Sequence, residues 1–345
     1  MDFSHSESLP PPPTVFGALK SGFDAVAAHI AVILLPVVFN VFLWLGPRLR
    51  MDRLIQPLLD EFSSFSTMRF APEQIELVKA FYTHVFAHWN LLTLMRTFPV
   101  GVSSLLTWMN TGEIAAWNPK SLTLIPADLN TPLGQASVLQ VSSAGELFIW
   151  LVALTLGGWI LGGVYYYVVS QSVNTGRQTP ASSLAGAVLQ TVLLSLIWTF
   201  LLMCIGLPAL MLLAIFGLFG QVVVNVAFVL MGILFVWLAL PFFFSAHGVF
   251  IQGQNALHSI WSGFRFVRFT APTSSLFALA AVATSQGLNL LWSVPSPDSW
   301  MLAVGIAGHA FVTTALLAGS FVYYRDMSTW LQAAFEQMKR RMSTI

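Results

Sequence analysis

Two histidines on one predicted helix face offer the first candidate chemistry in this sequence. His84 and His88 stand four residues apart, so on a helix they share a face and could hold a metal ion. Glu73 or Glu76 upstream would supply a further ligand. The zinc-protease pattern needs a glutamate directly after the first histidine, where this chain has Val85. The polar stripe of an interfacial helix is the favoured interpretation, and no metal site is predicted.

Intramembrane proteolysis is the second chemistry that the residue types suggest. A serine from Gly101-Val-Ser103-Ser104 and the histidine of Gly308-His309 could meet inside a helical bundle as nucleophile and base. Glycine beside serine is common where membrane helices pack, so a packing role is favoured. The predicted spans also hold no pair of acidic residues, which argues against a carboxylate-based membrane protease. The sequence therefore predicts no catalytic residue and no enzyme.

Neutral polar residues at membrane depth could line a substrate path or a site for a lipid head group. They are His29, Asn40, Gln190, Asn225, Gln286, Asn289 and His309. They could equally form hydrogen bonds between helices, each worth on the order of 0.6 kcal/mol to twice that, and this alternative is favoured. The best candidates for a polar centre are His29, Asn225 and His309. No cofactor is predicted.

Glycines spaced by four residues mark a candidate packing seam. Gly158 and Gly162 form a GxxxG pattern that flattens one helix face, so that another helix can approach closely. Small residues in the last span form a similar row: Gly305, Gly308, Ala315 and Gly319. Such seams serve either internal packing or a subunit interface, and internal packing is the default expectation.

Composition places these residues in a membrane protein. The chain has 345 residues, of which 56% are hydrophobic and 8% charged, and its mean hydropathy is +0.76. A soluble domain carries roughly 25% charged residues, so lipid-facing helices are the simplest explanation. A net charge of +1 argues against nucleic-acid binding, which needs a clustered basic face. The single cysteine, Cys204, excludes an intrachain disulfide.

The predicted fold is all-α, with about six transmembrane helices arranged as three hairpins. An apolar stretch of roughly 20 residues crosses the hydrocarbon layer. Such stretches cover Val26–Leu45, Leu147–Val169, two spans within Leu184–Phe244, Ser275–Trp292 and Met301–Tyr323. The third stretch could hold two long or three short helices. The positive-inside tendency favours two, with Pro208 bending the first and Gly217 to Gly220 near the turn.

Basic residues near the short loops predict the orientation. One side of a six-span arrangement carries Lys20, Arg177, Arg265, Arg268, Arg325, Lys339, Arg340 and Arg341. The positive-inside tendency makes this side cytoplasmic, with both termini, in the plasma membrane. Residues 46–145 open with three arginines, but long loops largely escape the tendency, so this segment is expected to be extracytoplasmic.

The chain divides into five parts on this plan. Residues 1–25 form a flexible Pro-rich tail and a short amphipathic helix, 26–45 the first span, and 46–145 the extracytoplasmic segment with interfacial helices. Residues 146–324 hold the other five helices of the bundle, and 325–345 form a basic amphipathic cytoplasmic tail. Within the long segment we expect a helix over Ala71–Leu94, a partly re-entrant turn in FPVGVSSLLTWM, and a lid over residues 117–134.

Short amphipathic pieces directly before the odd-numbered spans suggest a shared hairpin plan. These pieces are Gly17–Phe23, Ala181–Val188 and Ala256–Phe269. The last contains ALHSIWSGFRFVR, with Ala256, Ser259, Ser262, Arg265 and Arg268 in a regular pattern. This layout, mainly over Gln178–Arg341, resembles the six-span membrane domain associated with bacterial glycerophosphoryl diester phosphodiesterases and related uncharacterised membrane proteins. The catalytic soluble domain of such proteins has no counterpart in this sequence, so the resemblance implies a fold and no reaction.

The sequence thus favours a non-catalytic integral membrane protein that serves as a subunit, scaffold or assembly partner of a membrane complex. The expected partners are the lipid bilayer and other subunits, and no nucleic acid. The alternative is a transporter or lipid-handling protein with a polar site in the bundle. A continuous water-accessible cavity reaching the candidate polar centre would favour the alternative.

Overall fold

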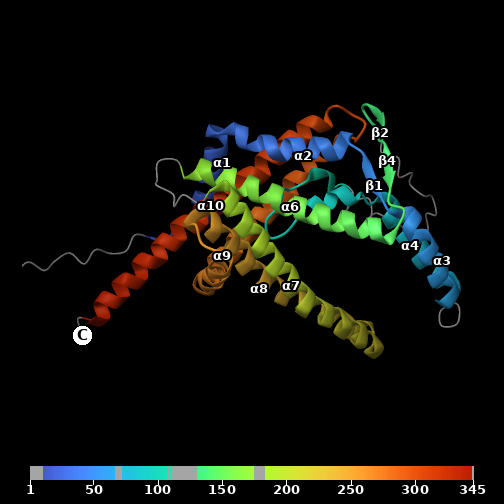
Figure 1. The fold of residues 1–345 in the computed structure, drawn as a ribbon. Coiled ribbons are helices and arrows are strands. Elements are labelled where there is room, and N and C mark those ends of the chain that lie inside the picture. The colour runs from blue at the N-terminus through green and yellow to red at the C-terminus, as the bar shows by residue number, and fades with distance from the viewer. Residues whose placement is uncertain (1–10, 67–71, 108, 110–129, 175–182, 344–345) are drawn as a thin grey trace, which may run out of the picture. The chain divides into compact units, whose positions relative to one another are not determined.

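The structure is a computed structural model that describes residues 11–66, 72–107, 109, 130–174 and 183–343 (Figure 1). The described part is predominantly helical, as an all-α fold requires. The chain forms two compact units, each assembled from separate stretches. Unit 1 comprises Met1–Val32, Tyr166–Val282 and Thr314–Ile345, and unit 2 comprises Ile33–Tyr165 and Ala283–Thr313.

Five helices of the described chain are long and apolar enough to cross a membrane. They are α6 (Ala144–Val173), α7 (Leu184–Phe216), α8 (Gln221–Gln252), α9 (Ala256–Trp292) and α10 (Leu302–Ser343). A sixth is obtained only by taking α1 (Val15–Ala28) together with the following stretch Ile30–Leu45. The helical class is therefore confirmed, with five or six apolar helices.

The predicted first span, Val26–Leu45, is not one continuous helix. The chain leaves α1 at His29 and continues as the 3-10 turn η1 (Ile30–Ile33) and α2 (Leu34–Leu45), with a bend of 98° between the two helical parts. His29 has non-helical dihedrals, and its N–H donates to the carbonyls of Ala25 and Val26. Pro36 cannot donate a backbone hydrogen bond, so it fits the first turn of a new helix better than the interior of a long one.

The α7–α8 hairpin confirms that Leu184–Phe244 holds two long helices. The 3-10 turn η3 (Gly217–Phe219) links them, and Gly220 follows with φ of 105°, a conformation that favours glycine. The two helices lie side by side (Figure 1). Trp198 and Phe242 pack between them with ring centroids 4.4 Å apart.

Helix α9 contains the predicted boundary between an amphipathic piece and a span. Thr270 has non-helical dihedrals, φ −122° and ψ 16°, two residues before Pro272. Pro272 lacks the N–H that would donate to the Arg268 carbonyl, and its ring clashes with that carbonyl, which accounts for a kink here. Helix α10 joins the predicted last span and the predicted C-terminal helix into one element of 42 residues.

The long segment of unit 2 contains more regular structure than its sequence predicts. Strand β1 (Arg48–Arg50) pairs in parallel with β4 (Val138–Gln140), which brings the two ends of the segment together. Strands β2 (Asn130–Thr131) and β3 (Gly134–Gln135) form a small hairpin. Helix α4 (Pro72–His88) confirms the core of the predicted helix, and the turn η2 (Leu91–Met95) follows it.

Interfacial helices were expected in residues 46–145, but none was predicted at α3 (Asp52–Ser66), which has Pro57 inside it. Helices α3 and α4 lie side by side (Figure 1). An exposed ion pair joins them, with Lys79 Nζ 2.6 Å from Asp60 Oδ1, and it raises the lysine pKa. Most of the predicted lid over residues 117–134 lies outside the described residues.

Close packing of α1 on α10 organises unit 1. A Cβ atom on Gly22 would lie 2.3 Å from the Gly319 nitrogen and 2.4 Å from the Ala315 carbonyl oxygen. Ala315, Ala318 and Gly319 are buried. Two residues of the predicted small-residue row in the last span thus serve packing within this unit.

We predict that Gly22→Leu destabilises the protein by about 1 to 3 kcal/mol or more, because the backbones of α1 and α10 must separate. Thermal unfolding of the purified protein in lipid discs would measure the loss as a lower midpoint. Gly287→Leu is the matched control, since a Cβ on Gly287 meets no atom within 4 Å. Equal midpoints for the two variants would contradict the packing argument.

Candidate functional site

The three residues of the predicted polar centre have different surroundings. His29 and Asn225 lie in unit 1 with exposed side chains. Each bonds within its own helix: His29 Nδ1 lies 3.2 Å from the Ala25 carbonyl oxygen, and Asn225 Oδ1 accepts from Gln221 at 3.0 Å. His309 lies in unit 2 and is 1% exposed. A buried polar cluster is therefore found around His309 and not around the other two.

The His309 cluster joins the last two helices within unit 2. Its Nδ1 lies 2.7 Å from Asn289 Oδ1, and Asn289 in turn donates to Gln286 at 3.4 Å. The other ring nitrogen, Nε2, is buried and has no hydrogen-bond partner among the described residues. The cluster thus ties α9 to α10 within unit 2.

Asn40 of α2 holds the segment around Ser103, which follows η2. This fully buried side chain donates to the Pro36 carbonyl at 2.8 Å and to the Ser103 carbonyl at 3.1 Å, and it accepts from the Leu105 amide at 2.9 Å. The segment around Ser103 is not regular helix, so its backbone groups need such partners. Asn40 replaces the missing helical hydrogen bonds.

This geometry bears on the serine and histidine considered for proteolysis. Ser103 accepts a hydrogen bond from Asn40 at its carbonyl oxygen, which suits a positioning role. His84 is buried in α4, and the His88 side chain lies outside the described residues. Among the described residues, no group of three His, Cys, Asp or Glu side chains could hold a metal ion.

The GxxxG seam of α6 packs against an irregular segment of unit 2 rather than another helix. A Cβ on Gly158 would lie 2.5 Å from the Met95 carbonyl oxygen, and one on Gly162 would lie 2.8 Å from the Gly101 backbone. Met95 to Gly101 contains the cis peptide bond Phe98-Pro99. The flat glycine face lets this chain run directly on the helix.

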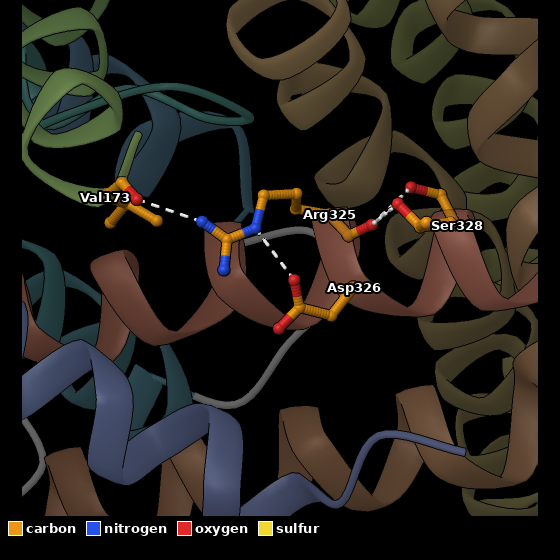
Figure 2. Close-up of polar contacts among 5 residues, drawn as sticks. Val173, Arg325, Asp326 and Ser328 are labelled. Atoms are coloured by element: carbon orange, nitrogen blue, oxygen red, sulfur yellow. Dashed lines mark hydrogen bonds and ion pairs between the residues drawn. The ribbon is translucent and has the colours of Figure 1, made fainter. Parts of the chain in front are cut away.

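Unit 1 carries a second polar region where the end of α6 meets α10. Arg325 of α10 donates from Nη1 to the Val173 carbonyl at the end of α6, at 2.9 Å, and from Nε to Asp326 at 2.8 Å (Figure 2). Ser328 and Thr329 donate to the Arg325 carbonyl. A cation at a helix C-terminus satisfies an orphan carbonyl and opposes the helix dipole.

The regular pattern in the first part of α9 divides into two faces. Ser259 donates its hydroxyl to the Ser245 carbonyl of α8, and the Ala256 amide donates to Gln190 of α7 at 2.8 Å. Ser262 and Arg265 instead line a cavity of about 210 Å³ between the end of α8, the start of α9 and α10. One face therefore builds the bundle and the other faces an open pocket.

Sequence reasoning missed several of these residues. His247 is fully buried in unit 1, where its ring bonds Ser320 at 2.7 Å, but it stands just beyond the predicted end of its span. Gln252, the last residue of α8, and Gln254, in the connection to α9, line the cavity and belonged to no motif. The polarity of this connection, directly before an amphipathic piece, was the available signal.

Comparison of the chain with models of known families, with curated proteins and with solved structures yields no match. The resemblance to the membrane domain associated with glycerophosphoryl diester phosphodiesterases therefore stays a hypothesis about helix layout.

We predict that Gly158→Ala lowers the thermal midpoint in lipid discs, at a cost of about 1 to 3 kcal/mol, because its methyl group meets the Met95 carbonyl. Gly157→Ala is the control on the adjacent position, where the nearest side-chain atom lies at 3.8 Å. The seam assignment fails if both variants lose stability equally.

A second prediction concerns the Asn40 clamp. Asn40→Leu removes two hydrogen bonds to the Ser103–Leu105 segment, so we expect a loss of about 1 to 2 kcal/mol. Equilibrium unfolding by titration with SDS would measure it. Asn225→Leu is the same substitution at an exposed site with a local bond, and its curve should match the unsubstituted protein. A larger loss of stability in Asn225→Leu than in Asn40→Leu would contradict the role of Asn40 in holding the Ser103–Leu105 segment.

Proposed function

We propose that this protein is a non-catalytic, multi-pass integral membrane protein that acts as a subunit, scaffold or assembly partner of a membrane complex. Insertion in the bilayer is supported by the five long helices, whose most apolar windows have mean hydropathies of 1.4 to 2.6. The non-catalytic role is supported by the buried polar residues of the bundle, such as Asn40, Asn289 and His309, which serve hydrogen bonds between elements.

The observation that carries the subunit proposal is the uncovered outer part of the α7–α8 hairpin. In the most apolar 18-residue stretches of α7 and α8, 0% and 6% of the stretch is buried within the chain, against 67% in α10. Among the described side chains from Thr199 to Leu240, only Ala227 is buried. A stretch this long makes its contacts across the hairpin alone and leaves its outward faces for lipid or for other helices.

Two details favour a protein partner over lipid alone. Helix association in membranes depends on close packing at small residues, since lipid is as apolar as leucine. Gly206 and Gly232 lie on the exposed hairpin with no atom within 4 Å of a Cβ position, which leaves room for a neighbouring helix. Beside the turn, an apolar groove of about 400 Å³ is lined by residues that include Phe216, Val226 and Leu230.

We further propose that the protein lies in the plasma membrane with both termini in the cytoplasm. The support is the positive-inside tendency applied to the basic residues near α1, α9 and α10. Residues 46–145 would then be extracytoplasmic. The hairpin turn at Gly217 to Gly220 carries no Lys or Arg, as an external turn should.

Cys204 provides a direct test, because it is the single cysteine of the chain and is exposed on α7. We predict that a photoreactive maleimide attached there forms a defined protein adduct on illumination of native membranes. The control carries Cys204→Ser and Leu279→Cys, which moves the label to an exposed position of α9. Lipid adducts alone at both positions would contradict the subunit proposal, while an adduct with a second copy would identify self-assembly.

The second candidate is a transporter or lipid-handling protein, and the buried His309–Asn289 pair is the observation that favours it. A substrate path would have to reach this pair. Labelling of single cysteines along α9 and α10 with a water-soluble reagent distinguishes a transporter from a structural subunit. Reactive positions near Asn289 support transport, and protected positions support a packed structural cluster.

A further inference from the structure

The cavity in unit 1 has the composition of an anion site. Its lining includes Arg265 and His258 and contains no aspartate or glutamate. The two ion pairs found among the described residues, Lys79 with Asp60 and Arg325 with Asp326, do not involve Arg265. The Arg265 guanidinium lies 5.6 Å from the centre of the Phe335 ring. Stacking of this kind supports the guanidinium plane and leaves its N–H groups available for a bidentate partner.

The neutral groups of the cavity also offer donors. Ser262 donates to Gln254 Oε1 at 2.6 Å, and the Gln254 side-chain nitrogen donates to Gln252 Oε1. Both amide oxygens are thus occupied within the network, which leaves amide N–H groups for a ligand. Two of the first amides of α9 already have partners, because Ala256 donates to Gln190 and His258 donates to Asn255. A ligand would therefore be recognised by side chains and not by the helix start.

One wall of the cavity is apolar. It is formed by Phe266, Phe269, Leu331 and Phe335. The cavity also lies just past the last apolar turn of the predicted span in α10, beside Tyr324, where the head groups of a bilayer would be. On the same α9 segment, Leu257 is 72% exposed and Trp261 is 70% exposed, as expected of residues that enter the membrane surface. The site therefore combines phosphate-binding donors with a surface for hydrocarbon.

We propose that this cavity binds the phosphate-bearing head group of an anionic phospholipid, with Arg265 as the main contact to the phosphate. A volume of about 210 Å³ suits a head group better than a large cofactor, since pockets for drug-sized ligands begin at about 300 Å³. The same donors would fit free phosphate, but a soluble anion would gain nothing from the phenylalanine wall. This site is separate from the α7–α8 surface and does not depend on the subunit proposal.

The test measures lipid selectivity of the full-length protein in nanodiscs of phosphatidylcholine. Energy transfer from the protein's tryptophans to pyrene-labelled acyl chains reports binding of phosphatidylglycerol or phosphatidylcholine as added lipid. We expect a preference of about tenfold for phosphatidylglycerol, because the choline cation of phosphatidylcholine offsets the attraction between its phosphate and Arg265, whereas phosphatidylglycerol carries a net negative charge. Arg265→Gln should abolish this preference.

Arg268→Gln is the matched control, because it removes the same charge from the same helix. Arg268 lies over the Phe269 ring at 5.8 Å and does not line the cavity. Its preference should match that of the unsubstituted protein. Equal losses in the Arg265 and Arg268 variants would show a general surface-charge effect and overturn the proposal, as would the lack of any preference in the unsubstituted protein.

Two further arms complete the test. Gln332→Phe fills the cavity from α10, where Gln332 is exposed, and should abolish the preference while Arg265 remains in place. This variant keeps the proposal testable if Arg265→Gln fails to fold. In the second arm, inorganic phosphate is added as a competitor. If the preference for phosphatidylglycerol is retained, the lipid site is supported. If phosphate removes the preference and leaves the binding of phosphatidylcholine unchanged, the site takes a soluble phosphate and the lipid assignment is overturned.

Discussion

Hydrophobicity alone cannot decide which helix packs on which in this chain, because the least buried helices, α7 and α8, are also the most apolar, with mean hydropathies of 2.5 and 2.6. Contacts between helices must then be selected by the fit of their surfaces and by buried polar groups, which need hydrogen-bond partners within the protein. Close approach at glycine supplies the first, as where Gly22 meets Gly319 in unit 1 and Gly158 meets Met95 in unit 2. Buried side chains such as Asn40 and His247 supply the second.

The same constraint explains how the chain tolerates its breaks. A helix satisfies its own backbone groups, but each interruption leaves donors and acceptors that a membrane cannot solvate. At His29 the backbone N–H bonds back to Ala25 and Val26, and at Thr270 the side chain bonds to the Phe266 carbonyl at 2.8 Å. The segment around Ser103 is not regular helix, and Asn40 of α2 provides hydrogen-bond partners for its backbone groups.

The parts of unit 1 differ in how completely they are covered, and the proposals follow from this difference. The α7–α8 hairpin exposes apolar faces with open glycines, which suits another apolar helix. The start of α9 and the end of α10 expose a basic and donor-rich cavity with a phenylalanine wall, which suits a charged lipid. Two kinds of partner can thus be separated by chemistry within one unit.

Length, apolar composition and the position of Gly and Pro allowed much of the helical plan to be predicted. The two helices of Leu184–Phe244, their turn near Gly217 to Gly220 and the boundary inside α9 near Pro272 follow from local preferences of the backbone. Helix α3 was not predicted individually, and β1 and β4 were missed because their pairing joins residues far apart in the chain.

By itself, then, the sequence determined the helical class, the approximate ends of the apolar helices and the residue types that a polar site could use, since each depends on neighbouring residues. Only the tertiary structure decided which polar residues meet. Asn289 lies against His309, whereas Asn225 bonds within its own helix, although the predicted polar centre included Asn225 and not Asn289. Likewise, Arg265 lines a cavity and Arg268 does not. The physical reason is that packing places one face of α9 against α8, and this packing distinguishes residues that have the same local chemistry.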